Sequence, residues 1–309
     1  MGLILIFLLA ACRKAQSSQM LTETLDQDNI ERTYQIYWPP DFNTEELSPL
    51  VIALHGGGGQ GSQFDQGTTQ GTLTAAAEER GVVLVFPEGI DKQWCDGRFA
   101  QLDTERQCDT VNDVAFISEI IDTMVEIYGI DPTRVYATGI SNGGFMSVRL
   151  AIDLSEKIAA VAPVAAQLSV ALEGKTPQNP ISIMIINGTD DPLVPFDGGH
   201  VRLFESGRSR GEILSTAVTI EHFRQYNHCD AAPQLVELPD NDPDDGTTVT
   251  IEPYARCDDG AEVTLVKVIG GGHTWPGGKQ YLGPKLVGVV SHEINASEMI
   301  LDFFLEHSR

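Results

Sequence analysis

The stretch ATGISNGGF, residues 137–145, decides how this chain is organised. The apolar run before it predicts a strand and the run after it predicts a helix, so Ser141 lies at a strand-to-helix corner. Gly139, Gly143 and Gly144 flank it, and glycine tolerates positive φ and close backbone approach. A serine on such a turn is exposed at the end of a sheet, with helix N-terminal N–H groups near its oxygen. That is the geometry of a nucleophile. The alternative is a tight turn with a capping serine, and the rest of the chain has to decide.

Continuous apolar runs of strand length alternate with helical runs along the chain. Several apolar runs end in Gly or Pro, as strands buried on both faces of a parallel sheet do. The predicted parallel strands cover residues 49–57, 81–89, 134–140, 158–166, 181–188 and 262–271. The predicted helices cover residues 72–80, 112–129, 145–157 and 212–227, and a final helix capped by Asn295 and Glu298. This order predicts an α/β fold, with a mostly parallel central sheet and helices on both faces.

Three other segments are predicted to be strands outside this alternation. Residues 32–38, RTYQIYW, predict an edge strand. Residues 231–238 and 248–257 predict a hairpin around the acidic turn PDNDPDDG, residues 239–246. The turn lacks the ligand spacing and the terminal Glu of an EF-hand, so we expect no metal there.

Length and charge limit the kind of protein. A chain of 309 residues, 42% of them hydrophobic, can bury a large core in one α/β domain. The formal net charge of −24 makes nucleic acid an unfavourable partner. The sequence does not indicate an oligomeric state.

The N-terminus resembles an export signal. The apolar run over residues 2–11 is too short for a bilayer span of about 20 residues, but it fits the apolar region of a secretory signal. LAAC, residues 9–12, resembles a bacterial lipobox, in which Cys12 would carry the lipid; no Lys or Arg precedes the apolar run. We therefore expect a signal segment over residues 1–12, a polar tether over 13–31 and a single domain over 32–309. The protein would then be a periplasmic or outer-membrane lipoprotein, or be secreted.

Four cysteines remain after Cys12, namely Cys95, Cys108, Cys229 and Cys257. None belongs to a C-x-x-C pair, which argues against zinc or a thioredoxin-type site. Two disulfides in an oxidising compartment are the simpler account, with three connectivities open.

Candidate partners for Ser141 also follow predicted strands. Asp190 and Asp191 come after residues 181–188, and His273 lies in the glycine-rich VIGGGHTWPGG after the last strand. Asp191 is the preferred acid because Pro192 biases it towards an extended conformation, with Asp190 as the competitor. Catalytic groups gather at the carboxyl ends of such strands. The sequence therefore predicts a serine nucleophile with a histidine base and an orienting aspartate.

A second glycine run could stabilise an oxyanion. LHGGGG, residues 54–59, follows a predicted strand and exposes backbone N–H groups. We expect the N–H groups of Gly57 and Asn142 to form the oxyanion hole, and His55 to brace the loop. Trp94 and Trp275 lie on loops near the predicted site. They are either packed in the core or form an aromatic wall for an acyl or phenolic group.

These motifs together resemble a known family. LHGGGG, GIDKQWCDGR, GIDPTRVYATGISNGGFMS, GTDDPLVPFDGG and GGGHTWPGG are similar to bacterial esterases of the polyhydroxybutyrate depolymerase type. Such enzymes are related to feruloyl and acetylxylan esterases of the α/β-hydrolase fold. The resemblance covers roughly residue 30 to the end and implies a triad of Ser141, Asp191 and His273.

The resemblance also bears on the cysteines and on function. With nearness in sequence, it implies the pairs Cys95–Cys108 and Cys229–Cys257. It implies an exported serine esterase without metal or cofactor, which cleaves hydroxyalkanoate oligomers or feruloyl, acetyl or aryl esters through an acyl-enzyme. The alternatives are a peptidase on the same fold and a non-catalytic surface lipoprotein that binds a polymer.

Overall fold

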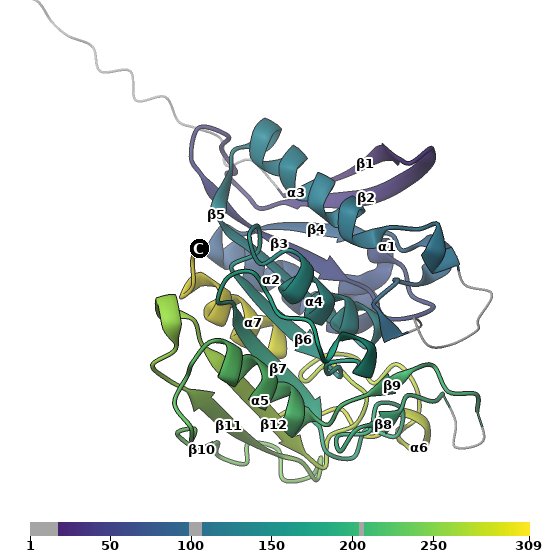
Figure 1. The fold of residues 1–309 in the computed structure, drawn as a ribbon, viewed down its shortest axis with the longest axis vertical. Helices are drawn as coiled ribbons and strands as arrows, with labels where there is room; N and C mark the ends of the chain where they lie inside the picture. Colours follow the sequence, from purple (N-terminus) through teal and green to yellow (C-terminus); the bar gives the residue numbers. More distant parts are fainter. Residues whose placement is uncertain (1–17, 99–106, 204–206) are drawn as a thin grey trace, which may run out of the picture.

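The computed structural model describes residues 18–98, 107–203 and 207–309 (Figure 1). The expected signal segment with Cys12, and residues 13–17 of the expected tether, lie outside these ranges. The described chain forms a ten-stranded sheet with a two-stranded hairpin beside it. In spatial order the sheet contains β1 (Gln19–Gln27), β2 (Ile30–Trp38), β4 (Val83–Pro87), β3 (Ser48–Leu54), β5 (Ile130–Ile140), β6 (Ala160–Val164), β7 (Ser182–Gly188), β12 (Val263–Ile269), β11 (Thr248–Tyr254) and β10 (Val236–Glu237). The hairpin pairs β8 (Gly199–His200) with β9 (Glu212–Ile213).

The central strands are parallel and the outer ones antiparallel. From β4 to β12, all neighbouring strands of the sheet pair in parallel. The predicted mostly parallel sheet is therefore confirmed. The predicted hairpin is confirmed as well, because β10 and β11 pair antiparallel beside β12.

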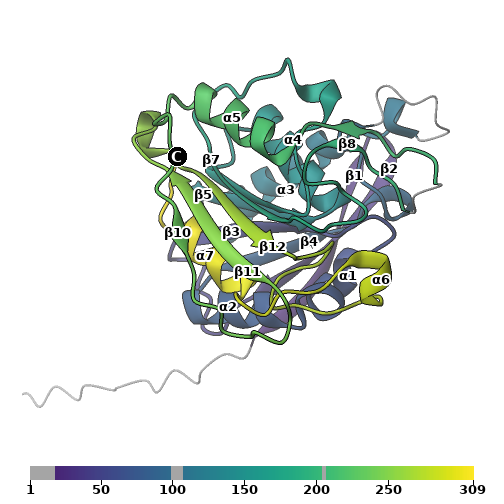
Figure 2. The same ribbon diagram turned by 90° about the horizontal axis from the view of Figure 1, so that it is seen from below.

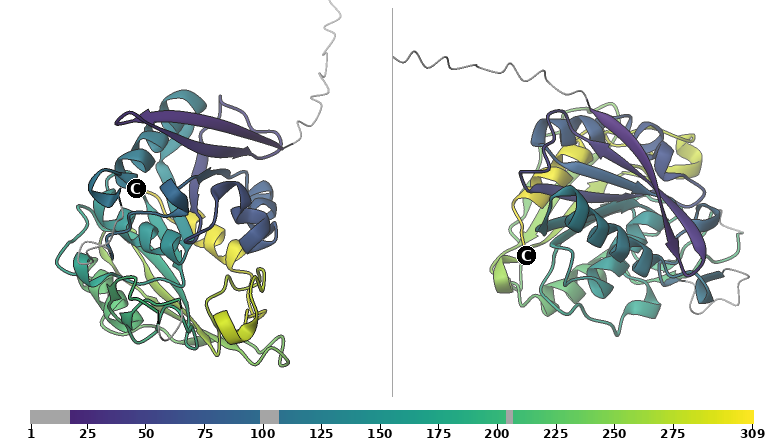
Figure 3. Two further views of the ribbon diagram at one scale, coloured as in Figure 1. Left: turned by 90° about the vertical axis from the view of Figure 1, so that its right-hand side faces the viewer. Right: turned by 90° about the horizontal axis from the view of Figure 1, so that it is seen from above.

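The first strand departs from the sequence prediction. The expected polar tether over residues 13–31 contains β1, which pairs antiparallel with β2 along its whole length. β2 therefore lies inside the sheet, and its predicted position at the edge is wrong. Figure 3 shows this hairpin as a long ribbon at one side of the molecule. Because most β1 side chains are exposed, the strand has a polar composition that resembles a linker.

Helices cover both faces of the sheet (Figure 2). One face carries α3 (Asp113–Tyr128), α4 (Asn142–Asp153) and α5 (Thr216–Tyr226), and the other carries α2 (Thr72–Arg80) and α7 (Ala296–Leu305). The short elements are α1 (Gly61–Phe64), η1 (Asp65–Thr69), η2 (Ile90–Lys92), η4 (Gln107–Asp109), η5 (Val170–Leu172), η6 (Asp258–Gly260) and α6 (Pro284–Val287). No helix in the described ranges is long and apolar enough to cross a membrane.

Successive side chains of β3 point to opposite faces of the sheet and pack into two separate hydrophobic cores. Leu50, Ile52 and Leu54 pack under the helices of one face, and Val51 and Ala53 under those of the other. All five side chains are fully buried. Burial on both faces explains why the strand reads as a continuous apolar run.

The two C-terminal helical predictions turn out differently. α5 begins later than the predicted residue 212, because Ser215 caps it by accepting the Val218 N–H and Glu212–Ile213 forms β9 instead. The capping of α7 is as predicted. Asn295 accepts the Ser297 N–H and donates to Glu298.

Candidate active site

Ser141 occupies the turn between β5 and α4. Its backbone has φ 55° and ψ −118°, a conformation that L-residues rarely adopt. The Ser141 N–H donates to the Val164 carbonyl at 2.9 Å, and the Ser141 carbonyl accepts the Phe145 N–H at 2.8 Å. Hydrogen bonds therefore hold the strained turn on both sides, and Ser141 lines the cavity at the end of the sheet.

The glycines next to Ser141 are needed for close packing of the backbone, and not for a positive φ of their own. None of Gly139, Gly143 and Gly144 has a positive φ; Ser141 itself does. A Cβ on Gly139 would lie 2.5 Å from the Leu54 carbonyl oxygen, and one on Gly143 would lie 2.1 Å from it. The glycines thus let α4 begin directly against the end of β3.

Asp191 and His273 meet at the ends of β7 and β12. Asp191 Oδ2 lies 2.7 Å from His273 Nδ1, and both side chains are buried. Asp191 Oδ1 accepts the Leu193 and Val194 N–H groups, each at 2.8 Å, which fixes the carboxylate plane. The contact makes Nδ1 the protonated nitrogen of neutral His273 and leaves Nε2 able to accept a proton.

The structure places Asp191, and not its neighbour, on the histidine. Asp190 is exposed and its carboxylate accepts the Thr189 hydroxyl at 2.9 Å. Its backbone N–H donates to the Gly271 carbonyl, which joins this turn to the histidine loop. Ser141 and His273 line the same cavity, and no hydrogen bond joins their side chains in the described chain. Catalytic hydrogen bonds are often long in unliganded enzymes.

Glycines also seat the histidine loop. A Cβ on Gly188 would lie 2.2 Å from the Gly271 carbonyl oxygen, and one on Gly272 would lie 2.3 Å from that of Val287. The Tyr281 hydroxyl donates to the His273 carbonyl at 3.1 Å. Burial, with a smaller effect of the Asp191 charge, raises the pKa of Tyr281, so this phenol stays a donor.

His55 braces the loop after β3, as predicted. Its Nε2 accepts the Gly89 N–H at 3.0 Å, so the proton of the neutral ring is on Nδ1 and is donated to the Gly56 carbonyl at 2.8 Å. Burial lowers the pKa of His55 and favours this neutral form. The Gly57 N–H donates to no described residue.

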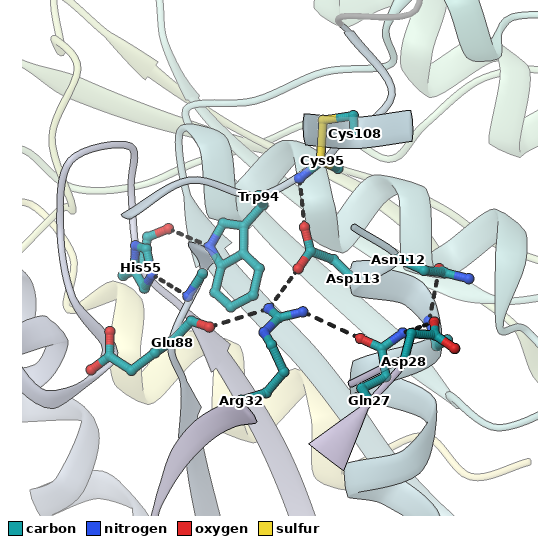
Figure 4. A network of polar contacts seen from close by, with 12 residues as sticks. Gln27, Asp28, Arg32, His55, Glu88, Trp94, Cys95, Cys108, Asn112 and Asp113 are labelled. Atoms are coloured by element: carbon teal, nitrogen blue, oxygen red, sulfur yellow. Dashed lines mark hydrogen bonds and ion pairs between the residues drawn. A yellow bond between two sulfur atoms is a disulfide. The ribbon is translucent and has the colours of Figure 1, made fainter. Parts of the chain in front are cut away.

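A buried polar network joins β2 and α3 to the segment at residues 88–95, to which His55 is also hydrogen-bonded (Figure 4). Arg32 on β2 and Asp113 on α3 form an ion pair at 2.7 Å with both side chains fully buried. Arg32 also donates to the Glu88 carbonyl at 3.3 Å, and the Cys95 N–H donates to Asp113 at 2.7 Å. Removing one partner of such a pair leaves a buried unpaired charge, which costs about 3–5 kcal/mol. The network therefore fixes the segment that carries Trp94 and Cys95.

The side chain of Asn142 is tied to the same segment. Its Oδ1 accepts the Trp94 N–H at 2.8 Å, and its Nδ2 donates to the Trp94 carbonyl at 3.0 Å and to Asp96 at 2.6 Å. Asn142 is the first residue of α4, so its backbone N–H has no partner within the helix. The sequence indicated only this backbone group and did not reveal the role of the side chain.

Trp94 and Trp275 are core residues, and the predicted aromatic wall is wrong. Each is 1% exposed, and neither is among the residues that line the cavity. Trp94 Nε1 donates to the His55 carbonyl at 2.9 Å. Trp275 Nε1 donates to Ser297 at 3.1 Å. Trp94 therefore supports the loop that carries His55, and Trp275 ties the loop that carries His273 to α7.

The cavity in front of Ser141 has a volume of about 420 Å³. Its wall includes Ser141, Asn142, His273 and the loop at residues 55–60. It also includes residues that the sequence did not suggest, among them Gln93, Arg98, Leu193, Arg210 and Tyr281. Gln93, Arg98 and Leu193 lie within the motifs GIDKQWCDGR and GTDDPLVPFDGG, but the sequence assigned these side chains no role. Arg210 and Tyr281 lie outside the quoted motifs, and only the folded chain brings all five residues together.

Both disulfides have the predicted connectivity. Cys95 bonds to Cys108 with a Cα–Cα distance of 5.5 Å. Cys229, just after α5, bonds to Cys257, just after β11. The second bond ties a covering helix to the strand beside β12, which leads to His273.

Comparison with known proteins identifies the family of the chain. Residues 32–199 match the family model described as esterase PHB depolymerase. The chain belongs to this esterase family. Its match to the protein named "Putative esterase NocK" of Nocardia uniformis subsp. tsuyamanensis is 33% identical over 89% of this chain and 79% of that protein. Feruloyl esterase B of Piromyces equi is 29% identical over 79% of this chain, but the match spans only 43% of that protein.

Solved structures show the same fold. A thermostable esterase superposes with a TM-score of 0.58 at 17% identity, over 94% of this chain and 63% of that one. Acetyl xylan esterase from Aspergillus awamori superposes with a TM-score of 0.55 at 16% identity, over 82% of this chain and 94% of that one. The fold is therefore that of the α/β-hydrolases, and this member of the esterase PHB depolymerase family is a carboxylic ester hydrolase.

Proposed function

We propose that the protein is an exported serine esterase in which Ser141, His273 and Asp191 form the catalytic triad. The observation that supports this most is the 2.7 Å contact between buried Asp191 and His273, on the same cavity as the strained Ser141. A serine in this conformation is costly, and such strain concentrates at functional sites.

The proposed chemistry follows from the orientation of each group. His273 Nε2 takes the proton of Ser141 Oγ as the oxygen attacks the ester carbonyl. Asp191 holds the ring and stabilises the imidazolium. The N–H groups of Asn142 and Gly57 stabilise the oxyanion, and the protonated His273 then donates to the leaving alcohol. Water cleaves the acyl-enzyme by the same route in reverse.

The relatives and the disulfides support the substrate class and the location. The names of the family and its relatives point to hydroxyalkanoate, feruloyl and acetylxylan esters, and we propose esters of these kinds as substrates. Disulfide bonds persist in oxidising compartments, so the two bonds support export. A lipid on Cys12 remains part of the proposal.

Replacement of the nucleophile tests the proposal. We expect Ser141→Ala to lower kcat on p-nitrophenyl butyrate by about 10⁴-fold or more with an unchanged melting temperature. A fluorophosphonate probe should label the wild type on Ser141 and leave the variant unlabelled. A loss of only a few-fold, or labelling of another residue, would contradict the assignment.

A further inference from the structure

The charges on the cavity wall oppose the average charge of the chain. The sequence has 44 acidic and 20 basic residues. Among the described residues that line the cavity there are two arginines, Arg98 and Arg210, and no aspartate or glutamate. Asp191 contacts His273 but does not itself line the cavity.

Arg98 has a protein partner. Its guanidinium contacts Asp96 at 2.6 and 2.9 Å and stacks on the Phe145 ring, 3.9 Å from the centroid. Asp96 is buried and also accepts the Asn142 amide. This carboxylate thus compensates Arg98 and joins it to the residue next to the nucleophile.

Arg210 differs from Arg98 in this respect. Its side chain is half-buried, and its guanidinium makes no hydrogen bond or ion pair with a described residue. Burial and, after it, the positive charge of Arg98 lower the pKa of Arg210. Two cations therefore face one cavity, and within the described ranges an anionic side chain pairs with Arg98 but not with Arg210.

The backbone holds Arg210 in place. Its N–H donates to the Val201 carbonyl at 2.8 Å, and the Val201 N–H donates to the Gly211 carbonyl at 3.0 Å. Gly211 has φ +107°, and a Cβ there would lie 2.6 Å from the Arg98 Cβ. The segment before β9 therefore packs closely against Arg98, which lines the same cavity as Ser141.

We propose that Arg210 is a specificity-determining residue that binds a carboxylate of the substrate. Preferred substrates are then esters with a free acid group, either half-esters of dicarboxylic acids or ester-linked hydroxy acids with a free carboxyl end. A guanidinium presents paired N–H donors that match a carboxylate, and Arg98 adds attraction. This inference rests on the proposed function, because it places the reacting ester at Ser141.

Two matched pairs of esters test it. The hydroxybutyrate dimer and its primary amide place the charge on the alcohol side of the ester. Monomethyl adipate and methyl 5-carbamoylpentanoate place it on the acyl side. Hydrolysis is followed in a pH-stat at an ionic strength of about 0.1 M, at which exposed charges are screened beyond about 10 Å. We expect the wild type to prefer the acid to the amide in at least one pair by about tenfold in kcat/KM, as expected for a charged hydrogen bond.

Variants with the same change of charge separate contact from long-range effects. Arg210→Gln should reduce the acid-to-amide ratio to within about twofold of unity, and Arg210→Lys should retain part of it. Arg208→Gln removes a charge from the same loop at an exposed residue that does not line the cavity. It should keep the wild-type ratio, because exposed charges are screened. Melting temperatures and fluorophosphonate labelling check that each variant is folded.

The ratios decide the outcome. Wild-type ratios at or below one in both pairs, or an unchanged ratio in Arg210→Gln, would overturn the carboxylate site. Hydrolysis of p-nitrophenyl butyrate and labelling of Ser141 would meanwhile show that the proposed esterase function holds. If neither hydrolysis nor labelling occurs, it is the proposed function that fails.

Discussion

Replacing Gly143 with alanine tests how closely the turn at Ser141 and the loop after β3, the proposed oxyanion loop, are packed. The new Cβ would lie 2.1 Å from the Leu54 carbonyl oxygen and 2.6 Å from that of His55. Real Cβ atoms essentially never approach heavy atoms closer than 3.0 Å, so the end of β3 and the start of α4 must separate by about 1 Å. That displacement moves Gly57 away from Ser141.

The expected effects follow from this displacement. Overpacking of this kind costs about 1–3 kcal/mol, which lowers the melting temperature by roughly 2–12 °C for a chain of this size. A misplacement of about 1 Å in an active site can cost about 10²-fold in rate. We therefore expect Gly143→Ala to lose about 10²-fold in kcat on p-nitrophenyl butyrate.

Gly174→Ala is the matched control. A Cβ at Gly174 meets nothing within 4 Å, and its φ is not positive. It should leave activity unchanged and either leave stability unchanged or raise it slightly, by up to about 1 kcal/mol. If Gly143→Ala keeps activity within about threefold of the wild type, the close contact is not needed for catalysis and the reasoning is refuted.

Three other perturbations address the acid, the loop brace and the disulfides. In Asp191→Asn the Oδ1 atom keeps its two backbone donors, so the NH₂ faces His273 Nδ1 and forces the proton onto Nε2; kcat should fall by about 10⁴-fold with the melting temperature nearly unchanged. Burial lowers the pKa of His55, so as pH falls the imidazole takes up a proton in the unfolded chain before it does so in the folded one. The neutral His55 therefore stabilises the fold fully above about pH 6.5. This contribution to the free energy of unfolding is lost as pH falls towards the lower folded-state pKa, by up to about 1.4 kcal/mol per pH unit. His55→Gln should flatten the melting temperature between pH 7 and 5.5. Reduction of both disulfides should lower the melting temperature by about 10 °C.

Each of these has an outcome that would count against it. An Asp191→Asn enzyme within tenfold of the wild type would remove that residue from the mechanism. Equal pH slopes in the wild type and His55→Gln would assign the acid sensitivity to other groups, such as His222, whose pKa burial also lowers. An unchanged melting temperature after confirmed thiol release would show that the two loops are held by packing alone.

The sequence predicted the parts of the site that strand ends determine. Ser141, Asp191 and His273 each follow an apolar run bounded by glycine or proline, and parallel strands bring their carboxyl ends to one edge. The glycines beside Ser141 were recognised, but the positive φ falls on the serine. Which residue takes the strain depends on how α4 packs against β3, and that is not a local property.

The sequence could not predict the parts that depend on packing. Trp94 and Trp275 point into the core, and an aromatic on a loop carries no signal for its direction. Arg98 ends the motif GIDKQWCDGR, Arg210 belongs to no motif, and the two are far apart in sequence, yet they line one cavity. The sequence of β1 is polar because only one face of the strand packs against the rest of the protein.

The register of β1 also determines how the enzyme is presented to its surroundings. Gln19 pairs with Trp38, next to the start of β4, so the chain enters the sheet at the edge opposite the carboxyl ends of the parallel strands. At the other terminus, the Arg309 N–H donates to the Thr133 carbonyl near the start of β5 (Figure 1). Both ends of the described chain therefore lie on the side of the sheet opposite the strand ends that carry Ser141. A lipid on Cys12, or a support attached at either end, would leave the mouth of the cavity facing outwards, where an insoluble ester could reach it.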